Sequence, residues 1–212
     1  MAAQHQPIIY VQTPDGTTVV AKPVDPLFRS EEVNTEFAGD WLQLAYTWKL
    51  PPENEKTASS IELGKTASTT EQKKASVTER GIDFPYQFYA ASLAIEPGYR
   101  EAFMDSEVKK YSRQFSFENY ISGQNQSYIR IYSKKVVPVE KGLWDVMIVA
   151  TRVHATGDTI LAQEIFNRVI RQKAIDPDVS ERKLWGERET HLGQLLNEMQ
   201  HQGLQIVQVS EF

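Results

Sequence analysis

Residues 127–175 read SYIRIYSKKVVPVEKGLWDVMIVATRVHATGDTILAQEIFNRVIRQKAI. This stretch is rich in Val, Ile, Tyr and Thr, which favour β-strands. Two polar segments divide it, at residues 140–142 and 156–159, and both are short enough for hairpin turns. The stretch therefore predicts three consecutive antiparallel strands, and the rest of the fold is expected to be arranged around them.

The middle predicted strand, from Leu143 onward, has apolar residues on both faces near its centre. A strand of this kind is typically covered on both sides. Towards its end Arg152 and His154 make one face polar, which indicates that the cover stops there on that side. The third predicted strand has one core face and one partly solvated face.

A long helix is predicted before the sheet, from Asp25 and Pro26 to about Lys49. The Asp25 carboxylate can accept a free backbone N–H, and Pro26 suits the first helical position because it needs no hydrogen-bond partner there. Apolar residues recur every three or four positions: Val33, Phe37, Trp41, Leu44 and Trp48. This aromatic stripe predicts packing against the concave side of the sheet.

The flanking segments define the domain organisation. Short β-type runs on either side of the Asp15-Gly16 turn predict an N-terminal β-ribbon extension over residues 1–23. Residues 24–212 are predicted to form a single α+β domain. Pro51 and Pro52 end the first helix, and a polar flexible insertion follows at about 51–82, because it holds too few large apolar residues to form a core.

The remaining segments complete the predicted domain. Residues 84–95, interrupted by Glu96-Pro97-Gly98, indicate two short helices with a kink, and residues 115–120 a short additional strand. Asp176-Pro177 and Ser180 are start signals for a last helix, which Gly203 ends, and residues 204–209 predict a closing strand. The apolar residues of that helix are Leu184, Leu192, Leu195, Leu196 and Met199.

The fold class that follows is α+β. We expect a strongly curved antiparallel sheet of three to four strands wrapped around N-terminal helices, with an added C-terminal helix and strand.

The amino-acid composition argues against several classes of function. The chain has 28 acidic and 23 basic residues, a net charge of −5 and no cysteine. This balance argues against nucleic-acid binding, which needs clustered Lys and Arg. The absence of cysteine excludes disulfides, zinc–thiolate sites and thiol nucleophiles. The sequence contains no apolar run of about 20 residues, so any membrane attachment would depend on a segment absent from this chain.

Five polar residues on the predicted strands are candidates for chemistry: Asp145, Arg152, His154, Glu164 and Arg168. Strand alternation places Asp145 on the opposite face from Arg152 and His154, so they form no carboxylate–imidazole pair. Glu164 and Arg168 share a face and are within reach of Asp145 or Thr151, which indicates cross-strand charge pairing. We therefore predict no catalytic residue and no enzymatic activity.

The histidines and glycines give no sign of a bound metal or cofactor. His5, His154, His191 and His201 lack ligand spacing, and no HExxH motif occurs. Gly98, Gly123 and Gly142 stand alone, so no glycine-rich phosphate loop is present. We predict no cofactor-binding residue, no metal-binding residue and no cofactor.

Three stretches carry a family resemblance. They are YREAFM at 99–104, LWDVMIVATRVHATGDTILAQEIFNRVI at 143–170 and GLQIVQV at 203–209. Together with the order of elements, they resemble the periplasmic domain of the inner-membrane scaffold protein of type IV secretion and conjugation machines, which has the nuclear-transport-factor-2-like fold. The resemblance covers residues 26–50 and 84–209, and lies in architecture more than in a diagnostic motif.

The resemblance implies a non-enzymatic assembly component that associates with itself and with other proteins of the apparatus. It also implies a location on the periplasmic side of the inner membrane, whereas without it a cytoplasmic location is expected. The residues themselves leave an alternative, a small-molecule-binding or isomerase-like enzyme of the same fold. The curved sheet and the helices inside it would form a cone, and the enzyme would use the open end of this cone at Arg152 and His154.

Overall fold

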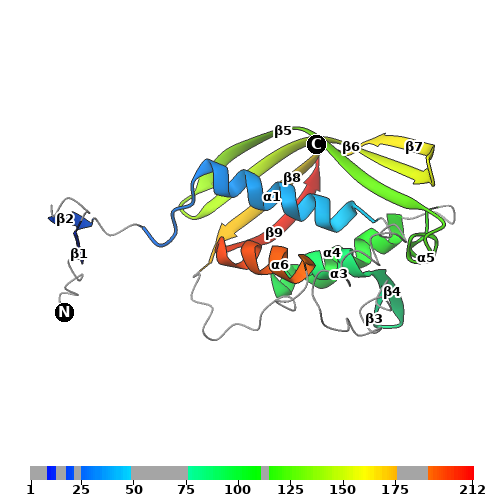
Figure 1. Ribbon diagram of the computed structural model, residues 1–212, viewed down its shortest axis with the longest axis horizontal. Helices are drawn as coiled ribbons and strands as arrows, with labels where there is room; N and C mark the ends of the chain where they lie inside the picture. The colour runs from blue at the N-terminus through cyan, green and yellow to red at the C-terminus, as the bar shows by residue number, and fades with distance from the viewer. Residues whose placement is uncertain (1–8, 13–17, 22–24, 49–75, 111–114, 176–190) are drawn as a thin grey trace, which may run out of the picture.

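The computed structural model describes residues 9–12, 18–21, 25–48, 76–110, 115–175 and 191–212. Helices and a large antiparallel sheet make an α+β fold, as the sequence predicts (Figure 1). Within the described ranges, no helix has both the length and the apolar character needed to cross a membrane.

The sheet has five strands: β5 (Gln126–Glu140), β6 (Leu143–Thr156), β7 (Thr159–Ile165), β8 (Arg168–Ala174) and β9 (Leu204–Glu211). Their order is β5-β6-β8-β9, and β7 pairs with the far half of β6. The predicted antiparallel meander over 127–175 is confirmed. Its third strand is divided in two, and the predicted closing strand joins as β9, so the sheet has five strands where three to four were expected.

The division between β7 and β8 falls at Phe166 and Asn167. The Asn167 side chain accepts a hydrogen bond from the Ala150 amide at 3.2 Å, and the Phe166 amide donates to the Ala150 carbonyl at 2.9 Å. A side chain thus replaces one backbone partner of the ladder. The register with β6 is the same on both sides of the break, because Thr151 faces Ile165 and Ile148 faces Arg168.

Helix α1 (Glu31–Tyr46) begins later than predicted. Asp25 accepts the Leu27 amide as expected, at 3.0 Å, but this makes only a single turn. The helix starts at Ser30, whose side chain accepts from the Val33 amide. The intervening Arg29 does not join the helix, since its guanidinium binds backbone carbonyls near the start of β9.

Helix α1 lies along the inner face of the sheet, as predicted (Figure 1). Phe37 and Trp41 are completely buried, and the Trp41 indole N–H donates to the Ala91 carbonyl at 2.9 Å. Trp48 lies beyond the end of the helix and pairs with Ser127 of β5 through two backbone hydrogen bonds. The aromatic stripe therefore forms the core on this side of the sheet.

The two faces of β6 are unequal, so the prediction that both are covered is wrong near the centre of the strand. Val146, Ile148 and Ala150 on the inner face are buried, whereas Val149 on the outer face is 38% exposed and Met147 is partly exposed. The packed helices lie on one side of the sheet (Figure 1). The outer face is open around Met147 and Val149, whereas Val153, further along the same face, is completely buried. The apolar residues on both faces of this strand therefore did not mean that other elements pack against both faces at its centre.

A hairpin precedes the middle helices. Strands β3 (Ser76–Glu79) and β4 (Ile82–Pro85) pair with each other. Strand β3 falls inside the predicted polar insertion, and β4 begins where that insertion was expected to end. Arg100 binds the Glu79 carboxylate at 2.9 Å and so connects the hairpin to a helix. Residues 49–75, which include Pro51, Pro52 and most of the predicted insertion, lie outside the described residues.

Three helices follow the hairpin: α3 (Tyr86–Ser92), α4 (Pro97–Lys110) and α5 (Phe117–Ile121). The first two confirm the predicted pair of helices interrupted near Pro97. The short strand predicted over 115–120 is wrong, because the segment forms α5. Ser116 caps this helix by accepting the Asn119 amide, and Phe117 and Tyr120 turn inward to the core.

The C-terminal part follows the prediction where it is described. Helix α6 (His191–His201) ends at Gly203, whose φ of 64° is the left-handed conformation that favours glycine. Leu196 and Met199 are buried. The predicted start signals at 176–180 and Leu184 lie outside the described residues.

The N-terminal ribbon is also present. Strands β1 (Ile9–Gln12) and β2 (Thr18–Ala21) pair antiparallel with each other in a sheet of their own. The turn predicted at residues 13–16 lies outside the described residues.

Candidate functional site

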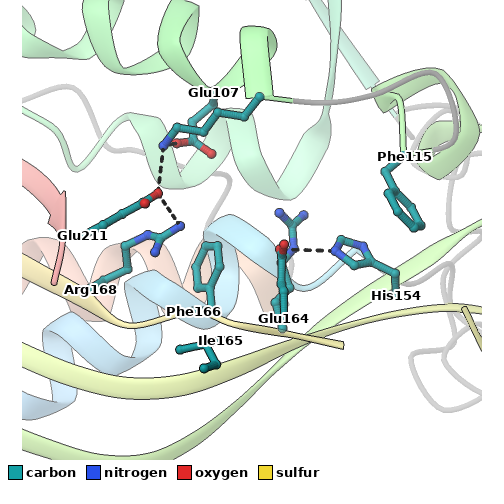
Figure 2. A pocket seen from close by; sticks show the side chains of 10 residues that line it. Glu107, Phe115, His154, Glu164, Ile165, Phe166, Arg168 and Glu211 are labelled. Carbon is teal, nitrogen blue, oxygen red and sulfur yellow. Dashed lines mark hydrogen bonds and ion pairs between the residues drawn. The ribbon is translucent and has the colours of Figure 1, made fainter. Parts of the chain in front are cut away.

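A cavity of about 220 Å³ opens at the end of the sheet where β6 and β7 meet (Figure 2). Side chains from α4, β6, β7, β8 and β9 line it, together with residues next to these elements. The lining residues are Glu107, Lys110, Phe115, Arg152, His154, Glu164, Ile165, Phe166, Arg168 and Glu211. Four of the five candidates from the sequence are among them, and we call Arg152, His154, Glu164 and Arg168 the mouth cluster.

Arg152 and His154 are only 3% and 4% exposed, so the prediction that cover stops at this end of β6 is wrong. Both side chains point to the inner face, because they continue the alternation of Ile148 and Ala150. Aromatic rings from the loops and from α5 extend the core over them. The polar residues on this face mark a buried polar site.

A hydrogen bond to Ser127 and contacts with aromatic rings hold Arg152 in place. Its Nε donates to the Ser127 hydroxyl at 2.8 Å. The guanidinium lies 4.7 Å from the Trp48 ring centroid, 5.2 Å from that of Tyr46 and 5.6 Å from that of Phe166. Cation–π attraction strengthens when water is excluded, so the rings compensate for part of the cost of burying this charge.

His154 joins Tyr120 to Glu164 in a hydrogen-bonded chain. The Tyr120 hydroxyl lies 2.6 Å from Nδ1, and Nε2 lies 3.3 Å from the Glu164 carboxylate. Burial raises the pKa of Tyr120 to about 12, so the phenol keeps its proton, and its O–H donates a hydrogen bond to Nδ1 when the imidazole is neutral. The other ring nitrogen, Nε2, therefore carries the proton that is shared with Glu164. The Phe115 ring stacks on the imidazole, with the two ring centroids 4.4 Å apart.

The hydrogen bond from His154 lowers the pKa of Glu164, and this outweighs the opposing effect of burial. Glu164 is thus ionised at neutral pH and is a weak proton acceptor. A general base works best with a pKa near the working pH. The chain from Tyr120 to Glu164 therefore orients the imidazole and holds a carboxylate at the cavity wall, and gives no strong acid–base pair.

A second chain of charges crosses the other side of the cavity (Figure 2). Arg168 Nη2 lies 3.2 Å from the Glu211 carboxylate, and Lys110 Nζ lies 3.6 Å from the same oxygen. Lys110 also binds Glu107 at 2.8 Å. Arg168 is stacked 3.6 Å above the Phe166 ring centroid. These contacts connect α4, β8 and β9 around the cavity.

Asp145 lies apart from the mouth cluster, on the outer face of β6. Its carboxylate accepts two hydrogen bonds from Arg171, at 2.7 and 2.9 Å. The predicted separation of Asp145 from Arg152 and His154 is confirmed. The predicted reach of Glu164 and Arg168 towards Asp145 or Thr151 is wrong, because both side chains point to the inner face, where their partners are His154 and Glu211.

Sequence reasoning missed Tyr120, Lys110 and Glu211. Tyr120 fell in a segment predicted to be a strand, and the other two are ordinary surface residues by type and position. No local pattern distinguished any of them. In the part of the chain that the structure describes, no group of three or more His, Asp or Glu side chains is arranged to hold a metal ion.

Comparison with known proteins gives little further guidance. No family model matches the chain, and no curated protein sequence matches it. Among solved structures, the chain is similar to the crystal structure of a TrwG component of a type IV secretion system from Bartonella birtlesii. The two sequences are 11% identical, and the TM-score is 0.43. The match covers 86% of this chain and 92% of that chain. A likeness this distant does not place the chain in that protein's family.

Proposed function

We propose that this protein is a non-enzymatic assembly component of a type IV secretion or conjugative transfer apparatus, located on the periplasmic side of the inner membrane. It acts through self-association and through contacts with other proteins of the complex. The secretion assignment is supported by the resemblance of the stretches at 99–104, 143–170 and 203–209. Self-association is supported by the exposed edge strand β7.

Strand β7 lies at one end of the sheet (Figure 1) and is exposed along nearly its whole length. Within the described residues it pairs only with β6, so its other edge presents unpaired backbone groups. Three large apolar side chains are exposed on it, and the most accessible, Ile165, is 82% exposed; the others are Ile160 and Leu161. An exposed apolar edge strand readily pairs with a strand of another chain.

The other two edges of the sheet are protected. Strand β5 carries exposed Lys134 and Lys135, and Pro138, which lacks a backbone donor. Charges and proline on an edge oppose pairing with other chains. Strand β9 is covered by the segment before α4, where the Glu96 amide donates to the Ile206 carbonyl at 2.7 Å. Only β7 lacks such protection among these edges, which favours it as the interaction surface.

A second copy of this chain fits the β7 edge. Antiparallel pairing of two β7 strands about Ala162 places each Glu164 opposite Ile160 of the second copy. No like charges then face each other across the new pair, so the repulsion that destabilises an antiparallel pairing is avoided. The contact is isologous, so it closes into a dimer with one continuous sheet and does not propagate.

Light scattering coupled to size-exclusion chromatography, at rising concentration, tests this proposal. The mass of the wild-type protein should rise from monomer to dimer. Ile165→Lys should weaken dimerisation about tenfold or more, which corresponds to ~1.4 kcal/mol, because a charge is placed on the pairing edge. Val139→Lys is the matched control: Val139 is also exposed, at 46%, but it lies on β5, and this variant should dimerise like the wild type.

A wild-type protein that remains monomeric at all concentrations and captures no other component of a type IV secretion apparatus would overturn the proposal. Dimerisation that Ile165→Lys leaves unchanged would remove β7 as its surface. A wild-type monomer that captures such a component would instead indicate a heterologous partner.

The cavity at the mouth cluster favours a second candidate function, the binding of a small molecule at the open end of the cone. Buried polar side chains converging on a concave site are typical of ligand pockets. The cavity volume of about 220 Å³ is below the roughly 300–1,000 Å³ of sites for drug-sized ligands, so the ligand would be small.

A further inference from the structure

The cavity contains a carboxylate that belongs to the chain itself. Glu211, at the end of β9, reaches to Arg168 Nη2 at 3.2 Å and to Lys110 Nζ at 3.6 Å. Its side chain is 63% exposed, whereas that of Arg168 is only 8% exposed. A buried cation thus meets a carboxylate that can move into solvent without disturbing the core.

We propose that this cavity binds a small organic monocarboxylate, whose carboxylate takes the position that Glu211 occupies in this structure. The inference rests on the second candidate function above, small-molecule binding at the open end of the cone, and gives it a ligand class. Glu211 then acts as an internal competitor that leaves when the ligand enters.

Arg168 is prepared for such a ligand before it binds. The central carbon of its guanidinium lies 3.6 Å from the Phe166 ring centroid, and its Nη1 donates to the Asn167 carbonyl at 2.8 Å. These two contacts leave Nη2 directed at the carboxylate of Glu211. A guanidinium fixed in this way loses little conformational entropy on binding, which favours affinity for a planar carboxylate.

The charges of the cavity match a ligand with one negative charge. Three basic and three acidic side chains line it, with His154 counted apart. Glu107 is already bound to Lys110, and Glu164 to His154. Removing Glu211 therefore leaves one excess positive charge, centred on Arg168. A buried positive charge without a partner is costly, so a monocarboxylate restores the balance.

The walls of the cavity indicate the body of the ligand. Phe166 lies beneath Arg168, and Phe115 stands across the cavity against His154 at 4.4 Å (Figure 2). Aromatic faces favour stacking with a planar ring. The small volume leaves room for a single ring, so an aromatic monocarboxylate fits the site.

Benzoate and benzamide are matched probes, because they have nearly the same shape and differ in charge. Titration into the isotope-labelled protein, followed by the backbone amide signals of residues 152–154 and 164–168, measures their dissociation constants. We expect benzoate to bind the wild type in the millimolar range. Glu211→Gln should bind it about two- to tenfold more tightly, because a partly exposed ion pair no longer competes.

Three further variants test the assignment. Glu140→Gln removes an exposed carboxylate at the far end of the sheet and should leave benzoate affinity unchanged. Arg168→Gln should abolish the preference for benzoate over benzamide. Lys110→Gln, at a more exposed position, should weaken benzoate binding in the same direction.

The possible failures are distinguishable. If benzamide binds Glu211→Gln as tightly as benzoate does, the site accepts small ligands but the carboxylate class is wrong. If neither probe shifts the cavity signals at millimolar concentration in the wild type or in Glu211→Gln, both the carboxylate inference and the small-molecule function are overturned.

Discussion

At the scale of single residues, Asp40 on α1 gives a test of the electrostatics. Burial, and then the nearby charge of Glu36, raise the pKa of this carboxyl, while Lys134 opposes them. A pKa raised above its unfolded value of 3.8 means that the folded state favours the protonated form. The resulting stability is present below pH 3.8 and is lost as the pH rises through the folded pKa.

Asp40→Asn should therefore raise the free energy of unfolding at pH 7, by no more than about 1 kcal/mol because solvent screens this partly exposed group. The gain should disappear below pH 3.8. Urea unfolding at several pH values measures it. Asp158→Asn, in the exposed turn between β6 and β7, makes the same substitution outside the core and is the control. A gain that is the same at pH 3 and pH 7 would contradict the account.

The large aromatic residues of the predicted helical stripe were placed correctly, whereas buried polar residues were not predicted. Phe37 and Trp41 follow from the helical spacing of a large apolar stripe. Gln172 gave no such signal, yet it is fully buried and donates to the Asn34 side chain at 2.6 Å. Because polar side chains are mostly exposed, only the tertiary structure reveals two polar side chains that bind each other inside the core.

At the scale of elements, Gly203 controls the join between α6 and β9. Its φ of 64° is unfavourable for other residues, and an added Cβ would meet the Arg29 guanidinium and the Ile175 carbonyl. The Arg29 side chain also binds the carbonyls of Gln202 and Gly203, at 2.7 and 3.1 Å. This junction thus fixes both the start of β9 and the segment before α1.

Gly203→Ala should lower the free energy of unfolding by about 1–3 kcal/mol, the typical cost of a strained left-handed residue. Chemical denaturation measures the change. Gly98→Ala is the matched control, because a Cβ at that position in α4 would meet no atom within 4 Å and no positive φ is required. It should be neutral or slightly stabilising. Equal stability of the two variants would show that the junction carries no strain.

The elements that were mispredicted have physical explanations. Asp25 and Pro26 carry a helix-start signal, and Asp25 does accept the Leu27 amide. However, the Arg29 side chain is held by a carbonyl near β9, so the helix begins only after Ser30, which caps it. Residues 115–120 have strand-like composition, and the cap at Ser116 together with inward packing of Tyr120 turns them into α5. Long-range contacts overrode local preference in both cases.

At the scale of the whole molecule, the arrangement of sheet and helix was predictable and the location of the polar site was only partly so. Strand alternation correctly separated Asp145 from Arg152 and His154. It could not show that α4 and the end of β9 bring Lys110 and Glu211 to the same cavity, because these residues are distant in sequence. The site at the mouth emerges only from the tertiary fold.

The central claim is that the interior of the curved sheet is occupied and that its exposed edge, β7, joins a second copy. Helix α1 fills the inner face with Phe37 and Trp41 completely buried, while every large apolar side chain of β7 is exposed. The free backbone edge of β7 should therefore gain hydrogen bonds on association, which amide hydrogen exchange detects directly.

Hydrogen exchange of the β7 amides at two protein concentrations is the most direct measurement. The account predicts that the amides of Thr159–Ile165 exchange slowly when the protein is concentrated and several-fold faster on dilution, while those of Arg168–Ala174 in β8 stay protected at both. Exchange in β7 that is equally fast at both concentrations would contradict the account.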